Sequence, residues 1–303
     1  MANPNKPMKV RENPLDRFWD RLIMVFLILA AVVTVAPFLY VVAGSFATEK
    51  ELTERAFFLI PHTISFNAYT YIARTGEIFR GLKNSLIITL IGTVTSLFFT
   101  STFAYPLSKQ HFKGRIPILN LVIFTMVFGG GMIPTFIVVR TLGLYNHFAA
   151  LILISAISPF NMVIMKSFFA GIPVDLEEAA FIDGCNDWSI YWRIYLPLSK
   201  PVLASIGLFC AVGHWNDYFS AMIYLSGAAK ETVQIVLRRI VLLASGGDQI
   251  NAAMFDFDML LGTPPDKAVK MAATVVATIP ILCVYPFLQK YFAKGVMVGA
   301  VKG

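Results

Sequence analysis

Long apolar stretches separated by short polar segments dominate the chain. A transmembrane helix needs about 20 predominantly apolar residues. Five charge-free runs meet or approach that length: Leu22–Phe46, Asn84–Ser108, Ile116–Val139, Phe148–Met165 and Met271–Gln289. A sixth run extends from Leu198 to about Ser226 and is interrupted only by Lys200 and Asp217. The pattern therefore predicts an all-α polytopic membrane protein with six transmembrane helices.

The composition supports a membrane protein and excludes an ordinary soluble domain. Of the 303 residues, 57% are hydrophobic and 14% charged, and the mean hydropathy is +0.68; soluble domains are about a quarter charged. Lys and Arg in short loops mark the cytoplasmic side. The basic residues before the first span, with Lys109, Lys113 and Arg115 after the second, therefore predict that both termini are cytoplasmic. The net charge of +7 then favours anionic lipid as a partner, and we expect no nucleic acid.

The polar segments divide the chain into a transmembrane domain with two notable loops and two short ends. We expect a cytoplasmic arm over residues 1–20, a six-helix domain over 21–292 and a cytoplasmic tail over 293–303. Within the domain, residues 173–197 form a polar loop between two spans, and residues 227–270 form the longest external loop.

Motifs for catalysis or metal binding are absent from the sequence. The three cysteines, Cys185, Cys210 and Cys283, form no CxxC motif and no cluster with histidine, so we expect no metal site. No GxxxxGK[ST] phosphate loop occurs, so the chain cannot bind ATP in the usual way. We therefore expect a protein that is not an enzyme and holds no cofactor of its own.

The loop at residues 173–197 predicts two short helices. Asp175 followed by Glu178 has the form of a capping box, and Gly184 supplies a helix stop. Leu176, Ala179, Ala180 and Ile182 would then share one face. A second helix would begin near Asn186 or Asp187 and place its aromatic residues on one stripe: Trp188, Tyr191, Trp192 and Tyr195. Such a pair fits either a protein partner or the membrane surface.

The residues of this loop resemble the EAA motif of ABC importer permeases. The match comprises Glu178-Ala179-Ala180, Asp183-Gly184, Leu196-Pro197 and Pro201, whereas Cys185 replaces the small residue that is usual in the family. The whole chain resembles the second permease of carbohydrate importers, closest to the complex-oligosaccharide subgroup. Its further markers are the stretches 128–134, 142–144, 213–217 and 295–303.

This resemblance implies a fold, a location and a set of partners. It implies a type I ABC importer permease fold in the bacterial cytoplasmic membrane. The partners would be a homologous permease, two cytoplasmic ATPase subunits that hold ATP and Mg²⁺, an extracellular binding protein and a sugar. The loop would couple to the ATPase through Glu178, Ala179, Ala180, Asp183, Gly184, Trp188, Tyr191 and Trp192. Gly299 and Lys302 in the tail would also reach the ATPase.

Polar residues within the apolar runs are candidates for the substrate pathway. Asp217 is the only carboxylate near the interior of a span, which favours a functional role, although an interfacial position fits equally well. Its neighbours supply hydrogen-bonding and stacking groups suited to sugars: His214, Trp215, Asn216 and Tyr218. Asn161 is a second candidate. Helix packing is the alternative for both His214 and Asn161.

Two other classes of function compete with an importer permease. An ion-coupled secondary transporter would show inverted repeats and several intramembrane ionisable groups, and Asp217 alone meets that description. An intramembrane enzyme would show a GxSxG or HExxH motif or paired carboxylates, and none is present in the sequence. The sequence therefore favours the importer permease.

Overall fold

The computed structural model describes residues 14–243 and 267–300, and all regular structure in these two ranges is helical. Three helices are long and apolar enough to cross a membrane: α1 (Pro14–Ser45), α4 (Glu77–Ser108) and α16 (Lys267–Ala300). Three bent helix pairs pass the same test when the two members of each are taken together. The described residues thus hold six spans if each bent pair counts as one.

The bends occur inside apolar runs that the sequence predicts as single helices. The run Ile116–Val139 forms α5 (Arg115–Val127) and α6 (Met132–Thr141), which meet at 116°. The sequence counts this run as one span, but the chain turns through residues 128–131, where Gly131 adopts a φ of +82° that residues with a Cβ disfavour.

The fourth run is divided in a similar way, and a further bend stands at the start of the sixth run. The fourth run forms α7 (Phe148–Ile154) and α8 (Pro159–Phe169), bent by 51°. The segment Asp187–Leu198 meets α12 (Lys200–Asn216) at 81°. The sixth run was expected to extend to Ser226, but α12 ends at Asn216 and a separate helix, α13, covers Phe219–Tyr224.

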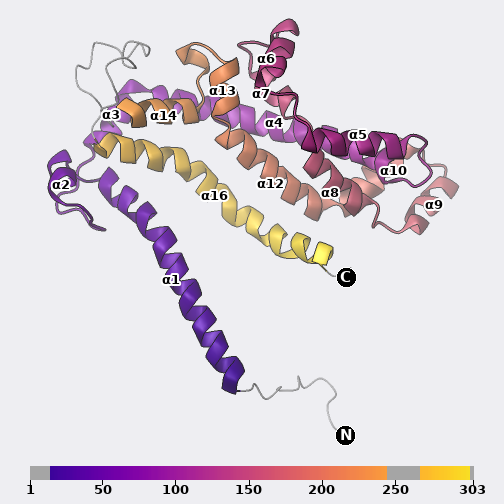
Figure 1. Ribbon diagram of the computed structural model, residues 1–303, viewed down its shortest axis with the longest axis horizontal. Helices are drawn as coiled ribbons and strands as arrows, with labels where there is room; N and C mark the ends of the chain where they lie inside the picture. Colours follow the sequence, from indigo (N-terminus) through magenta and orange to yellow (C-terminus); the bar gives the residue numbers. More distant parts are fainter. Residues whose placement is uncertain (1–13, 244–266, 301–303) are drawn as a thin grey trace.

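Helix α4 extends between the two ends of the helical body (Figure 1). At a rise of 1.5 Å per residue, its 32 residues measure about 48 Å. It packs along α12, α8 and α14 (Val233–Leu243). The end where α4 begins also carries α2 (Glu49–Glu54) and α3 (Asn67–Thr75), whereas the opposite end carries α9 (Val174–Ile182) and α10 (Asp187–Ile190).

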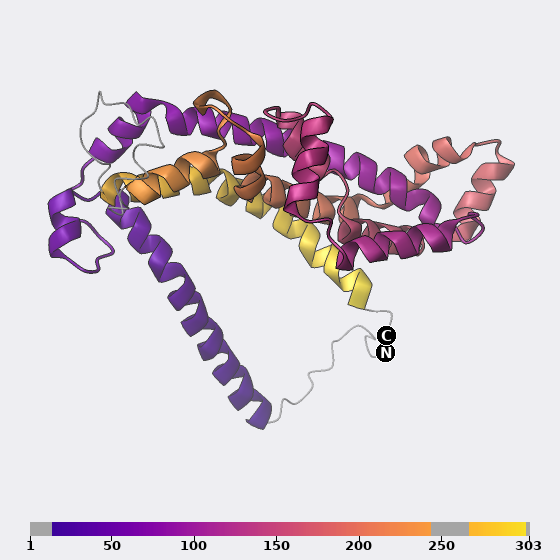
Figure 2. The same ribbon diagram turned by 45° about the horizontal axis from the view of Figure 1, so that its top comes forward.

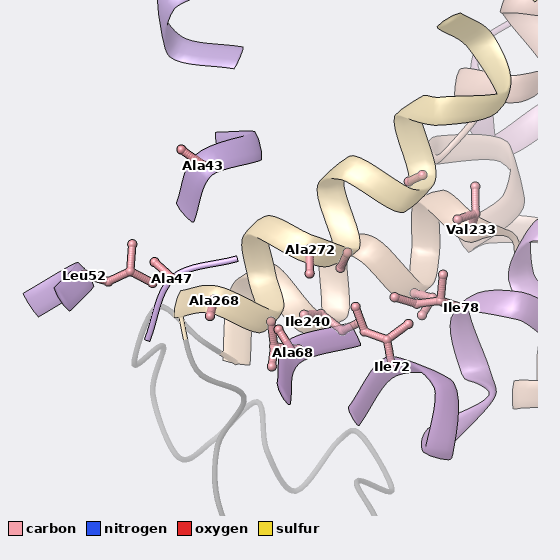
Figure 3. Packing of buried hydrophobic residues seen from close by; sticks show 14 of the residues in the cluster. Ala43, Ala47, Leu52, Ala68, Ile72, Ile78, Val233, Ile240, Ala268 and Ala272 are labelled. Atoms are coloured by element: carbon pink, nitrogen blue, oxygen red, sulfur yellow. The ribbon is translucent and has the colours of Figure 1, made fainter. Parts of the chain in front are cut away.

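Small residues on α16 build the apolar core at the α3 end of the molecule. Ala268, Ala272, Ala273 and Ala277 are buried there with residues of α3, α4 and α14, and Figure 3 shows Ile72, Ile78 and Ile240 beside them. Small side chains allow helices to approach closely in a membrane. α14 is a helix within the predicted external loop at residues 227–270.

Helix α1 leaves the body of the molecule from the same end (Figure 2). It packs on α16, but none of its most apolar 18-residue window is buried. Exposed apolar side chains along a helix of this length suit a lipid environment. Residues 14–20, expected in a polar arm, are already part of α1.

The last helix extends further than the predicted span. α16 continues to Ala300 with no break near residue 292, so Gly299 is a helical residue rather than part of a separate tail. Lys302 lies outside the described residues, as do residues 244–266 of the predicted external loop.

Candidate docking and coupling site

The first helix of the predicted coupling loop is confirmed, but its start differs from the prediction. α9 begins at Val174, with Pro173 at the N-cap position and no side-chain cap. The predicted capping box is therefore wrong. Asp175 lies inside the first turn, where an acidic side chain interacts favourably with the helix dipole. Gly184 ends the helix as expected, with a φ of +81°.

The face that α9 turns toward the body is polar and small rather than apolar. Glu177 and Ala180 are the buried residues of α9. Ile182, which was expected to share a face with Ala180, is 86% exposed. Phe181, Val174 and Leu176 are also exposed. The apolar residues of α9 therefore remain available for a partner.

The second helix begins where the sequence predicts. The Asn186 side chain accepts a hydrogen bond from the Ser189 N–H at 2.8 Å and so caps α10. The helix continues as a π-helical segment, η1 (Tyr191–Tyr195), and then as α11 (Leu196–Leu198). π-Helical segments are rare and often occur at functional sites.

The four aromatic residues of this second helix do not share one stripe. Tyr191 and Tyr195 are buried, whereas Trp188 and Trp192 are exposed. The two indole rings lie edge to face, with centroids 5.9 Å apart. Four apolar side chains of this loop are thus exposed: Phe181 and Ile182 of α9, Trp188 of α10 and Trp192 of η1. We call these four residues the docking surface.

The buried tyrosines attach this segment to the end of α4. The Tyr191 hydroxyl lies 2.7 Å from the Ser101 hydroxyl and 3.3 Å from that of Thr102. The Tyr195 ring packs against Tyr105 of α4 and Phe169 of α8, with centroids 4.9 and 5.6 Å away. Both contacts join the π-helical segment to membrane-spanning helices.

A buried charged cluster joins α9 to the same end of α4. Lys109 follows the last residue of α4 and forms an ion pair with Glu177 of α9, and both side chains are 8% exposed. The Tyr195 hydroxyl accepts a hydrogen bond from Lys109 Nζ at 2.7 Å and donates one to Glu177 Oε2 at 2.8 Å. We call these three residues the Lys109 cluster.

Lys109 is buried and lies against two aromatic rings. Its Nζ lies 4.0 Å from the centroid of the Tyr195 ring and 4.6 Å from that of Tyr105, which is cation–π geometry. Burial lowers the pKa of Lys109, and the Glu177 carboxylate acts in the opposite direction. A pocket of about 350 Å³ opens beside the cluster, between α9 and the chain that contains His111 and Arg115.

The sequence does not indicate the Lys109 cluster. Lys109 enters the sequence argument as one of several basic loop residues, and 68 positions separate it from Glu177. Glu177 precedes the EAA triplet and has no distinguishing local signal. The pairing depends on how α4 ends and how α9 packs, which only the fold specifies.

The structure distributes the predicted pathway residues over several environments. His214 is buried against α4, where its Nε2 lies 3.4 Å from the Ser96 hydroxyl. Asn161 is buried on α8 and its side-chain amide lies 3.6 Å from Cys210 Sγ of α12. Trp215 belongs to the buried cluster around α16.

The three following residues lie at the end of α12. Asn216 is exposed, and Asp217 and Tyr218 are half-buried. Asp217 accepts a hydrogen bond from the Ser220 N–H at 3.0 Å and so supports the turn into α13. The Arg238 guanidinium lies 4.5 Å from the centroid of the Tyr218 ring. The six candidates therefore do not form a single cluster, and their role in the pathway stays a prediction.

Bent and continuous apolar spans packed around α4, with exposed apolar side chains on the short helices at one end, are the features of a multi-pass membrane protein. The family model for "Binding-protein-dependent transport system inner membrane component" matches residues 8–298, and the chain belongs to that family. It is therefore a multi-pass inner-membrane permease of a binding-protein-dependent ABC importer.

Named relatives and a solved structure agree with this assignment. Two Bacillus subtilis (strain 168) proteins are each 50% identical over 95% of this chain: protein LplC, of which 96% is covered, and the polygalacturonan/rhamnogalacturonan transport system permease protein YtcP, of which 99% is covered. A chain of a bacterial ABC transporter involved in the import of the acidic polysaccharide alginate superimposes with a TM-score of 0.83 at 34% identity, covering 93% of this chain and 99% of that chain. The chain is thus a sugar or oligosaccharide importer permease, and nothing supports an ion-coupled transporter.

Proposed function

We propose that this chain forms half of a translocation pathway together with a homologous permease, and that its docking surface binds a cytoplasmic ATPase. The observation that carries the proposal is the exposure of Ile182, Phe181, Trp188 and Trp192 on the helical segments of the loop at residues 173–197. Large apolar side chains that are exposed close together in the sequence of one loop suit an interaction site. ATP and Mg²⁺ would be held by that ATPase, and an extracellular binding protein would deliver the sugar.

The ATPase assignment can be tested with two matched isoleucines. Ile182 is 86% exposed on α9 and Ile60 is 80% exposed in the loop at the opposite end of the molecule. We expect Ile182→Asp to abolish co-purification of a P-loop ATPase from gently solubilised membranes, and Ile60→Asp to leave it unchanged. Retention of the ATPase by Ile182→Asp would contradict the proposed docking surface.

The same two positions test the orientation of the chain. We propose that the docking surface and both termini are cytoplasmic. In a background without native cysteine, a membrane-impermeant maleimide should label Ile60→Cys in intact cells and Ile182→Cys after permeabilisation. Labelling of Ile182→Cys in intact cells would reverse the orientation.

We further propose that the transported sugar is an acidic oligosaccharide. The support is the printed substrate of two similar proteins, polygalacturonan/rhamnogalacturonan for one and the acidic polysaccharide alginate for the other. Vesicles that contain the co-purified complex and its binding protein should take up labelled uronate oligosaccharides in preference to neutral ones of equal length. Equal or greater uptake of the neutral sugars would refute this substrate class.

A further inference from the structure

We propose that the Lys109 cluster transmits movement of the docking helices to α4, so that Lys109 and Glu177 are positioning residues of energy coupling. This inference rests on the proposed binding of an ATPase to α9 and α10. Lys109 lies outside the EAA motif and contributes nothing to the docking surface. Its proposed role is to connect α9 mechanically to α4.

Besides the ion pair between Glu177 and Lys109, α9 has few buried contacts with the body of the molecule. Glu177 and Ala180 are its buried residues, and Ala180 offers only a methyl group. A force on the exposed face of α9 must therefore pass through the Glu177 side chain, through Ala180 or through the two ends of the helix. Of these contacts, the ion pair with Lys109 connects α9 directly to the end of a spanning helix.

The Lys109 cluster also fixes the distance and orientation of α9 relative to α4. An apolar contact can slide with little loss of energy, whereas an ion pair with hydrogen bonds fixes distance and orientation. The Tyr195 hydroxyl bonds both charged partners at 2.7 and 2.8 Å, so α9, the π-helical segment and α4 meet in one buried cluster. Movement of either docking helix would then displace the end of α4.

At its opposite end, α4 is bonded to the chain around α14. Arg239 of α14 forms ion pairs with Glu77, the first residue of α4, at 3.1 Å and with Glu231 at 2.8 Å. Asn84 donates hydrogen bonds to the carbonyls of Ala229 and Glu231, both at 2.9 Å. A displacement of α4 would thus reach residues 229–239, at the start of the predicted external loop.

The test must separate coupling from folding, because removing one partner leaves a buried charge unpaired. Replacing both partners of a buried ion pair by apolar residues is often neutral for stability. We therefore compare wild type with the double variant Lys109→Met/Glu177→Met in the full complex. The readout is the ratio of ATP hydrolysis with the sugar-loaded binding protein to hydrolysis without it, together with sugar transported per ATP.

We expect the double variant to assemble with the ATPase. Its stimulation ratio should fall by about five-fold or more, which is the lower end of typical allosteric coupling factors. Lys109→Arg should retain coupling, since it preserves the charge. Lys50→Met/Glu54→Met removes an exposed ion pair on α2 and should match wild type. Full stimulation and transport per ATP in the Lys109→Met/Glu177→Met complex would overturn the inference while leaving ATPase docking intact. A wild-type preparation that recovers no ATPase would overturn the proposed function and, with it, this inference.

Discussion

Substitution of Gly92 by alanine tests how α4 packs against α12. A Cβ on Gly92 would lie 2.6 Å from Nε2 of His214 and within 3.0 Å of two further ring atoms. Ordinary contact begins at 3.4 Å, so the imidazole must retreat by about 0.8 Å. Since His214 is 8% exposed and surrounded by helices, we expect Gly92→Ala to cost about 1–3 kcal/mol, the usual range for overpacking.

Gly213 provides a matched control on the same helix as His214. A Cβ there meets nothing within 4 Å, so Gly213→Ala should be neutral or stabilise the helix by about 0.5–1 kcal/mol. Thermal unfolding in detergent, followed by a fluorescent thiol probe or by loss of monodispersity, measures both variants. Adding His214→Ala to Gly92→Ala should relieve the clash and restore part of the loss.

Two results would refute this account of the helix interface. If Gly92→Ala unfolds at the wild-type temperature, the His214 ring does not occupy the groove beside Gly92. If His214→Ala and Gly92→Ala have additive effects, the two residues are not in contact.

Three further predictions concern the two ends of the molecule. Gly184→Pro should reduce ATPase retention, whereas Gly143→Pro should not. The two glycines are matched, since both have positive φ and donate their N–H to the carbonyl three residues earlier. Only Gly184 adjoins the docking surface. Arg239→Leu should destabilise the protein by about 2 kcal/mol in thermal unfolding, less than the cost at a fully buried pair, and wild-type stability would contradict this. Hydrogen bonding from the His62 N–H lowers the pKa of Glu51 below its usual 4.5. The stabilisation by the Glu51 carboxylate is therefore present at neutral pH and is lost as the pH falls through the lowered pKa. In acid, wild type should thus show weaker hydrogen-exchange protection of residues 51–62. Glu51→Gln should show the same weaker protection at pH 7.

The number and approximate position of the spans follow from hydropathy, because a membrane demands apolar length whatever the tertiary structure. The breaks inside those spans are harder to predict. A continuous apolar run such as Ile116–Val139 satisfies the length rule whether it is straight or bent. The 116° turn at residues 128–131 depends on packing that the pattern does not encode.

The docking helices show the same division between local and tertiary information. The Asn186 cap and the Gly184 stop use local backbone chemistry, so the sequence predicts them. Which face of α9 is buried depends on Lys109, a residue far away in the chain. The sequence pattern placed Ala180 and Ile182 on one face, whereas Ala180 is buried beside the Glu177 carboxylate and Ile182 is exposed.

The most direct test of the central claim is sugar uptake by proteoliposomes that contain the co-purified complex, with ATP enclosed and the binding protein outside. The account predicts that uptake requires ATP, persists without any ion gradient and is lost in Ile182→Asp. Accumulation of sugar that is driven by an ion gradient in the absence of ATP, and is unaffected by Ile182→Asp, would contradict it.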